Sequence, residues 1–186
     1  MLRHGILGLL SYYDRTGYEI MEVFNDSLSF MWNANTSQIY RELQSLKEKG
    51  FAHMTEVVQN GRPDKKVYSI TQSGREELMR WLTDFDGIRF PNFPVLMKVF
   101  FGGMLPPGDA IKALEKVKAD CIRRIGDMEG MLPRLESYKQ DTANEDYALF
   151  WDMSFDFGKG YCEYMVRWCE DCIRKIRQRM QEKESE

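Results

Sequence analysis

Three basic residues lie close together in a turn-forming stretch of the sequence, NGRPDKK at positions 60–66. Arg62, Lys65 and Lys66 carry guanidinium and ammonium groups, which can bind phosphates. The Asn-Gly pair and the proline in this stretch favour a turn, so the flanking runs FAHMTEVV and KVYSIT are predicted to pair as a hairpin. The three cations then lie at its tip. They either bind a polyanion there, or they keep the hairpin in solution and discourage edge pairing.

A second group of polar side chains occurs at helical spacing just before this hairpin. In the stretch SQIYRELQSLKEKGF, Ile39, Leu43 and Leu46 repeat with the helical period and are expected to face inward. Hydroxyl, amide and guanidinium groups then remain on the solvent side, where they suit base edges and phosphates. A helix with an ordinary solvated face would show the same pattern. The outward residues are Ser37, Gln38, Arg41, Gln44 and Ser45.

Local end signals mark the helices that must position these groups. A cap residue followed three positions later by Glu or Gln predicts a helix start, and a glycine after the last apolar residue predicts a helix end. Gly50 has the position of a left-handed residue that ends the helix of residues 35–49, with Phe51 after it. The predicted capping boxes are Thr16 with Glu19, Asn35 with Gln38, and Ser73 with Glu76.

The predicted order in the first eighty residues is helix, helix, helix, strand, strand, helix. This order is typical of a winged helix-turn-helix, in which the third helix reads DNA and the hairpin is the wing. The sequence therefore predicts a mainly α fold with a small β-hairpin. In this arrangement the cations at 62–66 reach phosphates or the minor groove, while the third helix contacts bases.

Three blocks of the sequence resemble the PadR family of bacterial transcriptional regulators: ILGLLSYYDRTGYEIMEVF, SQIYRELQSLKEKGF and GRPDKKVYSITQSGREELMRWL. The resemblance covers most of residues 5–82 and implies a homodimeric winged-helix protein, usually a repressor, that binds an inverted repeat. It also implies a set of DNA-binding residues. They are Ser37, Gln38, Tyr40 and Arg41 on the third helix and Arg62, Lys65 and Lys66 in the wing.

Two tyrosines at positions that match the family are open to more than one interpretation. Tyr40 is either a structural anchor or a phosphate contact, because a tyrosine beside an apolar stripe often packs with its hydroxyl at a polar partner. Tyr18 is expected in the core.

The second half of the chain has a long-helical pattern. After a linker rich in Pro and Gly comes a short apolar helix near 94–102, and a long helix begins at Asp109. Pro133 is expected to kink or shorten that helix, and a last helix runs from about 145 to about 180. The inward stripe predicted for the last helix is Tyr161, Met165, Trp168, Cys172 and Ile176.

The apolar stripes of the long helices suggest that these helices pack on a partner chain as well as on each other. This layout resembles a PadR subclass that has a helical C-terminal domain. We expect residues 1–83 to be the DNA-binding domain and residues 84–186 to be the dimerisation and effector domain. Aromatic and methionine residues concentrate around Trp151, Phe155 and Trp168. They form either a pocket for a flat apolar effector or, as such stripes more often do, the packed core of a dimer.

Composition and charge limit the classes of protein function that remain. The 186 residues have a net charge of −3, and residues 1–82 carry ten basic and ten acidic side chains, so DNA binding would depend on local clusters of cations. No apolar run is long enough to span a bilayer, and a cytoplasmic protein is expected. The four cysteines are interpreted as reduced core thiols in place of metal ligands, and no cofactor is predicted.

No motif of an enzyme was found, so catalysis is not expected. The leading hypothesis is a DNA-binding repressor that acts as a homodimer through its C-terminal helices and is released by a small hydrophobic or aromatic molecule. The alternative is a winged-helix adaptor that binds protein and no longer contacts DNA. Salt dependence separates the two, because phosphate contacts release counterions.

Overall fold

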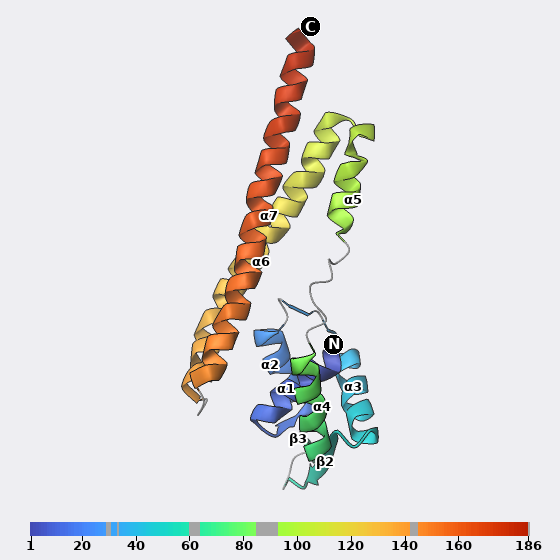
Figure 1. The fold of residues 1–186 in the computed structure, drawn as a ribbon, viewed down its shortest axis with the longest axis vertical. Helices are drawn as coiled ribbons and strands as arrows, with labels where there is room; N and C mark the ends of the chain where they lie inside the picture. The colour runs from blue at the N-terminus through green and yellow to red at the C-terminus, as the bar shows by residue number, and fades with distance from the viewer. Residues whose placement is uncertain (29–30, 33, 60–63, 85–92, 142–144, 186) are drawn as a thin grey trace. The chain divides into compact units, whose positions relative to one another are not determined.

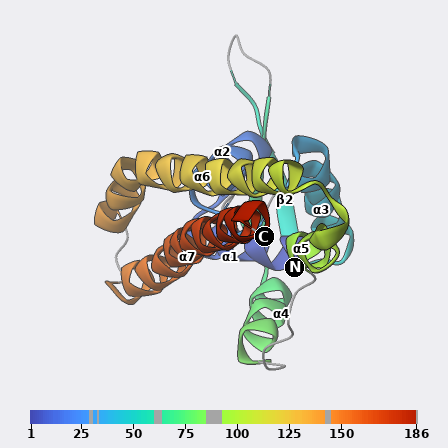
Figure 2. The same ribbon diagram turned by 90° about the horizontal axis from the view of Figure 1, so that it is seen from above.

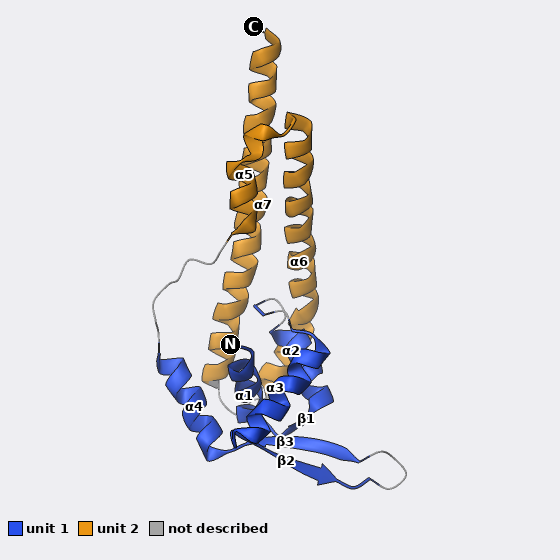
Figure 3. Ribbon diagram, turned by 90° about the vertical axis from the view of Figure 1, so that its right-hand side faces the viewer, with its two compact units in different colours: residues 1–88 blue, residues 89–186 orange. Residues whose placement is uncertain are grey.

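The structure is a computed structural model of residues 1–186, and it describes all of them except 29–30, 33, 60–63, 85–92, 142–144 and 186 (Figure 1). The predicted wing residue Arg62 lies outside the described residues. The chain divides into two compact units, Met1–Ile88 and Arg89–Glu186 (Figure 3). No helix among the described residues is both long and apolar enough to cross a lipid bilayer.

Unit 1 consists of helices around a small sheet. The core comes from the apolar stripes of the first three helices, with Ile6, Ile20 and Leu43 each fully buried. The mainly α fold with one hairpin that the sequence predicted is confirmed. The elements are α1 (Leu2–Tyr12), β1 (Arg15–Thr16), α2 (Gly17–Ser27), α3 (Thr36–Glu48), β2 (Ala52–Val57), β3 (Lys65–Ile70) and α4 (Gln72–Thr83).

The sheet is antiparallel with strand order β1-β3-β2. Strands β2 and β3 pair so that Glu56 is opposite Lys66 and Val57 is opposite Lys65. Figure 2 shows this hairpin extending away from the helices of unit 1. The two-residue strand β1, which the sequence analysis did not predict, places Arg15 beside Tyr68 and adds a third strand to β3.

Two of the three predicted capping boxes are present. In α2 the Thr16 side chain accepts from the Glu19 N–H while the Glu19 carboxylate accepts from the Thr16 N–H, and Asn35 does the same with Gln38 in α3. Gly50 ends α3 with φ of +71°, as predicted. Its N–H donates to the Lys47 carbonyl and the next N–H donates to the Leu46 carbonyl, which is the Schellman pattern.

The third predicted box is wrong. Thr71 caps α4, because its hydroxyl oxygen accepts from the Gly74 N–H at 3.1 Å. The Ser73 hydroxyl donates instead to the Gly50 carbonyl at 2.8 Å, and Glu76 accepts from Gln72. The Thr71 hydroxyl also donates to the Gly50 carbonyl, at 2.7 Å, so the start of α4 is bonded to the end of α3 through both residues.

Unit 2 is built on two long helices that lie side by side (Figure 1). Its elements are α5 (Pro94–Phe100), the 3-10 turn η1 (Gly102–Met104), α6 (Pro107–Asp141) and α7 (Glu145–Ser185). Pro133 was expected to kink or shorten its helix, but α6 continues for eight residues beyond it, so the shortening is wrong.

The inward stripe predicted for α7 is confirmed at Met165, which is 7% exposed, and at the three residues that follow it, but it differs at Tyr161. Leu114, Cys169 and Ile173 form a buried cluster, and Trp168, Cys172 and Ile176 pack against it. Tyr161 was expected to face inward but is 40% exposed, and the next residue, Cys162, is buried in its place. The cysteines lie in or beside the core as free thiols, and burial raises the pKa of the Cys169 thiol to about 11.

Candidate nucleic-acid interface

The exposed face of α3 carries the side chains that sequence predicted for base contacts. Ser37 and Arg41 are exposed to solvent, while Ile39 and Leu43 on the opposite face are fully buried in the core of unit 1. Burial of these apolar residues fixes the rotation of α3, so the same face must point to solvent in every copy of the fold. Ser37 and Arg41 therefore lie on one accessible helical face.

Gln38 has less hydrogen-bonding capacity than the sequence suggested. The Gln38 side-chain oxygen accepts from the Asn35 backbone N–H at 2.9 Å, and the Gln38 backbone N–H donates to the Asn35 side-chain oxygen at 2.9 Å. A paired contact to adenine uses the oxygen and the nitrogen of the amide together. Because one lone pair of the oxygen holds the cap, Gln38 can offer a base its amide nitrogen and the second lone pair of that oxygen while the capping box is intact.

Tyr40 both packs and stays accessible. It is 44% exposed, and its ring lies against the backbone of Gly17 at the start of α2. A Cβ atom added at Gly17 would lie 2.6 Å from the Cε1 atom of Tyr40 and 3.3 Å from its hydroxyl oxygen. The two interpretations of Tyr40, as an anchor and as a polar contact, are therefore compatible with each other.

The described cations of the wing are exposed on β3. Lys66 lies 3.8 Å from Glu56 on the paired strand, and both side chains are more than half exposed, so this ion pair adds little to stability. Lys65 is also exposed and lies near Glu19, where it contributes to the lowered pKa of that carboxyl. Both lysines can exchange these carboxylates for a phosphate at little cost.

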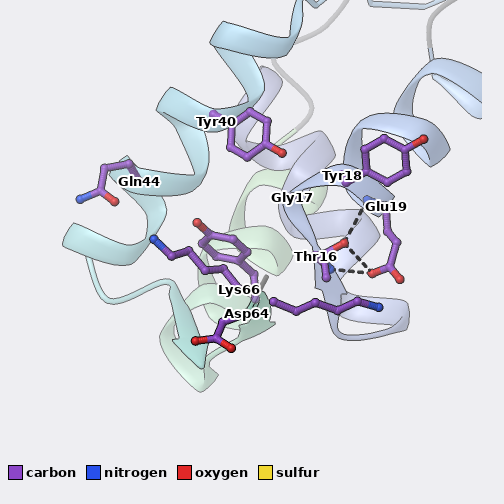
Figure 4. A pocket seen from close by; sticks show the side chains of 10 residues that line it. Thr16, Gly17, Tyr18, Glu19, Tyr40, Gln44, Asp64 and Lys66 are labelled. Atoms are coloured by element: carbon purple, nitrogen blue, oxygen red, sulfur yellow. Dashed lines mark hydrogen bonds between the residues drawn. The ribbon is translucent and has the colours of Figure 1, made fainter. Parts of the chain in front are cut away.

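A depression of about 640 Å³ lies between the first turn of α2, helix α3 and strand β3. Figure 4 shows Tyr40 and Gln44 projecting from α3, Lys66 from β3, and Thr16 and Glu19 on the opposite side. The depression thus joins the predicted reading helix to the predicted wing. Of the residues predicted to bind DNA, Tyr40, Lys65 and Lys66 line it, whereas Ser37, Gln38 and Arg41 are not part of its lining.

The carboxyl of Glu19 is occupied by the cap of α2. Hydrogen bonding from the Thr16 backbone N–H, at 2.7 Å, lowers the pKa of Glu19, and the Thr16 hydroxyl donates to the same oxygen at 2.9 Å. The carboxylate is therefore ionised at neutral pH, and one of its two oxygens accepts both hydrogen bonds from Thr16.

Tyr68 also lines the depression, and the sequence analysis did not select it. It is 8% exposed, and burial raises the pKa of its phenol, with the nearby Tyr40 hydroxyl adding to the effect. Its hydroxyl therefore keeps its proton at neutral pH. The alternation of β3 gives the available signal, because Lys66 and Tyr68 are two residues apart and share one face of the strand.

Tyr18 was expected in the core, and that expectation is wrong. It is 58% exposed at the second position of α2, and a hydrogen bond to Glu22 one turn later raises the pKa of its phenol. The core side of α2 is instead formed by Ile20, Val23 and Phe24. Tyr18 precedes this stripe by two residues, which places it on the other side of the helix.

The three aromatic residues predicted for an effector lie on α7. Phe155 is 9% exposed, Trp151 is partly buried one turn before it, and Trp168 packs in the seam with α6. Thirteen residues separate Phe155 from Trp168, which corresponds to about 20 Å along a helix. One small molecule therefore cannot contact Trp168 together with the other two within one chain.

The family comparisons match both units. Residues 6–80 match the model of the transcriptional regulator PadR-like family, and residues 94–177 match a model described as virulence activator alpha C-term. A probable transcriptional regulator of Mycobacterium tuberculosis is 43% identical over 83 residues, which is 45% of this chain and 44% of that protein. The chain thus spans under half the length of this relative.

A second relative matches over nearly the whole chain. The negative transcriptional regulator PadR of Bacillus subtilis is 30% identical over 186 residues, covering 95% of this chain and 97% of that protein. Its crystal structure with operator DNA is similar with a TM-score of 0.78 at 27% identity, covering 94% of this chain and 98% of that one. The crystal structure of the same relative with p-coumaric acid is similar with a TM-score of 0.71 at 26% identity, covering 94% of this chain and 98% of that one.

Proposed function

This chain belongs to the PadR-like family of transcriptional regulators, and on that basis we propose that it is a repressor that binds an inverted-repeat DNA operator as a homodimer. The observation that carries the proposal is the juxtaposition of α3 and the wing around one depression. Exposed polar groups of α3 and exposed cations of β3 lie on the same side of unit 1, as phosphate and base contacts to one duplex require.

The roles of the predicted residues follow from their chemistry. Arg41 has an exposed guanidinium that suits guanine, and Ser37 adds a hydroxyl one turn earlier on the same helix. Lys65 and Lys66 supply charge to the phosphate backbone and set affinity for any sequence. The Bacillus subtilis relative solved with operator DNA supports DNA binding by a chain of this fold.

Exposed apolar side chains on unit 2 support the homodimer. On α7 a second stripe, with spacings of three and four residues, is exposed and borders the seam with α6 at Tyr161, near Cys121. Its members are Phe150 (63% exposed), Met153 (54%), Phe157 (77%), Tyr161 (40%) and Tyr164 (56%). Such a stripe needs a partner. A second copy of α7 would cover it and would pair two reading helices on one duplex.

We also propose that a small hydrophobic or aromatic molecule releases the repressor. The relative solved with p-coumaric acid supports this class of effector. In this chain Trp151 and Phe155 are the candidate contacts, because they are one turn apart on α7 and share a face. An effector would act only if it bound one arrangement of the dimer more tightly than the other.

Selection from sheared genomic DNA tests the proposed function. The purified chain should enrich fragments with a two-fold symmetric site, and its affinity should fall steeply as salt rises. Arg41→Ala should reduce discrimination between the enriched site and random duplex, whereas Lys65→Ala should weaken both and flatten the salt dependence. Lys112→Ala, in an exposed residue of α6, is the matched control. Absence of any DNA binding at every ionic strength would favour the protein-binding adaptor.

A further inference from the structure

The hydroxyl of Tyr68 is unusual for a buried tyrosine. The side chain is 8% exposed, yet its hydroxyl makes no hydrogen bond within the part of the chain that the structure describes. Buried tyrosines usually place the hydroxyl on a polar partner, because an unmet donor in a protein interior is costly. Here the hydroxyl opens into the depression between α3 and β3, since it is not among the buried unpaired polar atoms of the described residues, and a ligand bound there can accept from it.

A second hydroxyl faces the same depression from its other wall. Tyr40 comes from α3 and is held there by the close approach of its ring to Gly17. Over the described residues its hydroxyl also makes no hydrogen bond. Tyr40 and Tyr68 are near enough to influence each other electrostatically. Two unused O–H donors from separate elements therefore meet at one place.

The carboxylates in the depression already accept hydrogen bonds from the chain through one oxygen each. Glu19 holds the backbone N–H and the hydroxyl of Thr16, and the Asp64 carboxylate accepts from the Gln59 N–H at 3.2 Å. The charges of these two carboxylates balance those of Lys65 and Lys66. The two hydroxyls and the two lysine ammonium groups of the lining are donors, and a ligand rich in acceptor oxygens, such as a phosphodiester, fits them.

We propose that the hydroxyls of Tyr40 and Tyr68 together bind one backbone phosphate of duplex DNA, which makes Tyr68 a DNA-contacting residue. This inference rests on the proposed function. The phosphate belongs to DNA and not to a free small molecule, because the depression opens between the two elements that are proposed to lie on the duplex. The contact holds α3 and the wing to the same strand and carries no sequence information.

Removal of each hydroxyl alone tests the site. The probe is a fluorescein-labelled pool of 30-bp duplexes of random sequence, titrated with the full-length chain at several salt concentrations. Tyr68→Phe and Tyr40→Phe should each weaken binding by about tenfold, since a hydrogen bond to a charged acceptor is lost. The double variant should lose less than the product of the two, because both groups hold one phosphate.

Two further readouts distinguish a phosphate contact from a structural role. The slope of log affinity against log salt concentration should not change in Tyr68→Phe, because a neutral donor releases no counterion. In Lys66→Gln the magnitude of this slope should fall by about 0.9, because one charged contact to phosphate is lost. The melting temperature of Tyr68→Phe should equal that of the wild type, since no hydrogen bond inside the protein is lost. Tyr13→Phe, a half-exposed tyrosine of unit 1 outside the depression, is the control and should bind as the wild type does.

The outcomes separate this inference from the proposed function. If the wild-type chain binds the duplex pool and Tyr68→Phe binds equally well, the phosphate site is wrong and the DNA-binding function stands. A clear drop in melting temperature without loss of affinity would also overturn the site, since the hydroxyl would then have a partner inside the protein. If the wild type binds no duplex, both fall.

Discussion

Replacement of Gly17 by alanine should weaken DNA binding without unfolding unit 1. The added Cβ would lie 2.6 Å from Cε1 and 3.1 Å from Cζ of Tyr40. Carbon atoms in contact normally lie about 3.5–4.0 Å apart, so the ring must move by about 1 Å. Tyr40 is 44% exposed and has room to move outward, away from α2.

The expected magnitudes follow from that displacement. Hydroxyl-to-oxygen hydrogen bonds span about 2.5–3.0 Å, so a movement of about 1 Å breaks the contact of Tyr40 with a phosphate. The loss is about 1.5 kcal/mol, or roughly tenfold in affinity. Stability should change by less than about 1 kcal/mol, because alanine favours the helix over glycine while the displaced ring loses some contacts.

Gly8→Ala provides a matched control for this test. Gly8 is also a helical glycine of unit 1, but an added Cβ there meets nothing within 4 Å. Fluorescence anisotropy with duplex DNA and thermal unfolding, measured on both variants, separate binding from stability. Gly17→Ala should bind about tenfold more weakly and Gly8→Ala should bind as the wild type does. Equal affinity of both variants would refute the idea that Gly17 positions Tyr40 for DNA.

Three other predictions concern stability and assembly. Gly74→Ala should destabilise unit 1 by about 3 kcal/mol in urea unfolding, because the added Cβ would clash with the carbonyl oxygen of Phe51, which is rigid backbone. An unchanged urea midpoint would contradict this prediction. The hydrogen bond with His4, at 3.1 Å, lowers the pKa of Glu77. The ionised Glu77 therefore adds to the free energy of unfolding at a pH above the pKa that it has in the unfolded chain, and this contribution is lost as the pH falls through its folded-state pKa. The melting temperature should therefore fall less on acidification from about pH 6 to pH 3 in Glu77→Gln than in the wild type, and parallel curves would speak against the bond. Phe157→Glu should shift the chain towards monomer in sedimentation velocity, whereas an unaltered dimer would exclude the α7 stripe from the interface.

Local patterns in the sequence were sufficient for much of unit 1. The boxes at Thr16 and Asn35 and the left-handed Gly50 depend on residues within one turn of each other, so spacing alone predicts them. Thr71 caps α4 in place of Ser73, and the hydroxyls of both residues donate to the Gly50 carbonyl, 21 and 23 residues earlier in the sequence. Periodicity does not reveal a contact of this kind.

The candidate DNA interface was likewise predictable only where local residue patterns determine it. Ser37, Arg41, Lys65 and Lys66 were predicted from residue type and spacing, and the structure places them as exposed groups on α3 and β3. The role of Tyr68 depends on how far β3 lies from α3, and a sequence contains no direct signal for that distance. On α7 the expected stripe was off by one position at Tyr161, because aromatic residues occupy both faces of this helix.

The mass and symmetry of the protein–DNA complex test the central claim most directly. A duplex enriched from genomic DNA by the chain should be bound by two copies in sedimentation equilibrium, and footprinting should show two protected half-sites about one helical turn apart. One copy per duplex, or protection without two-fold symmetry, would contradict the account.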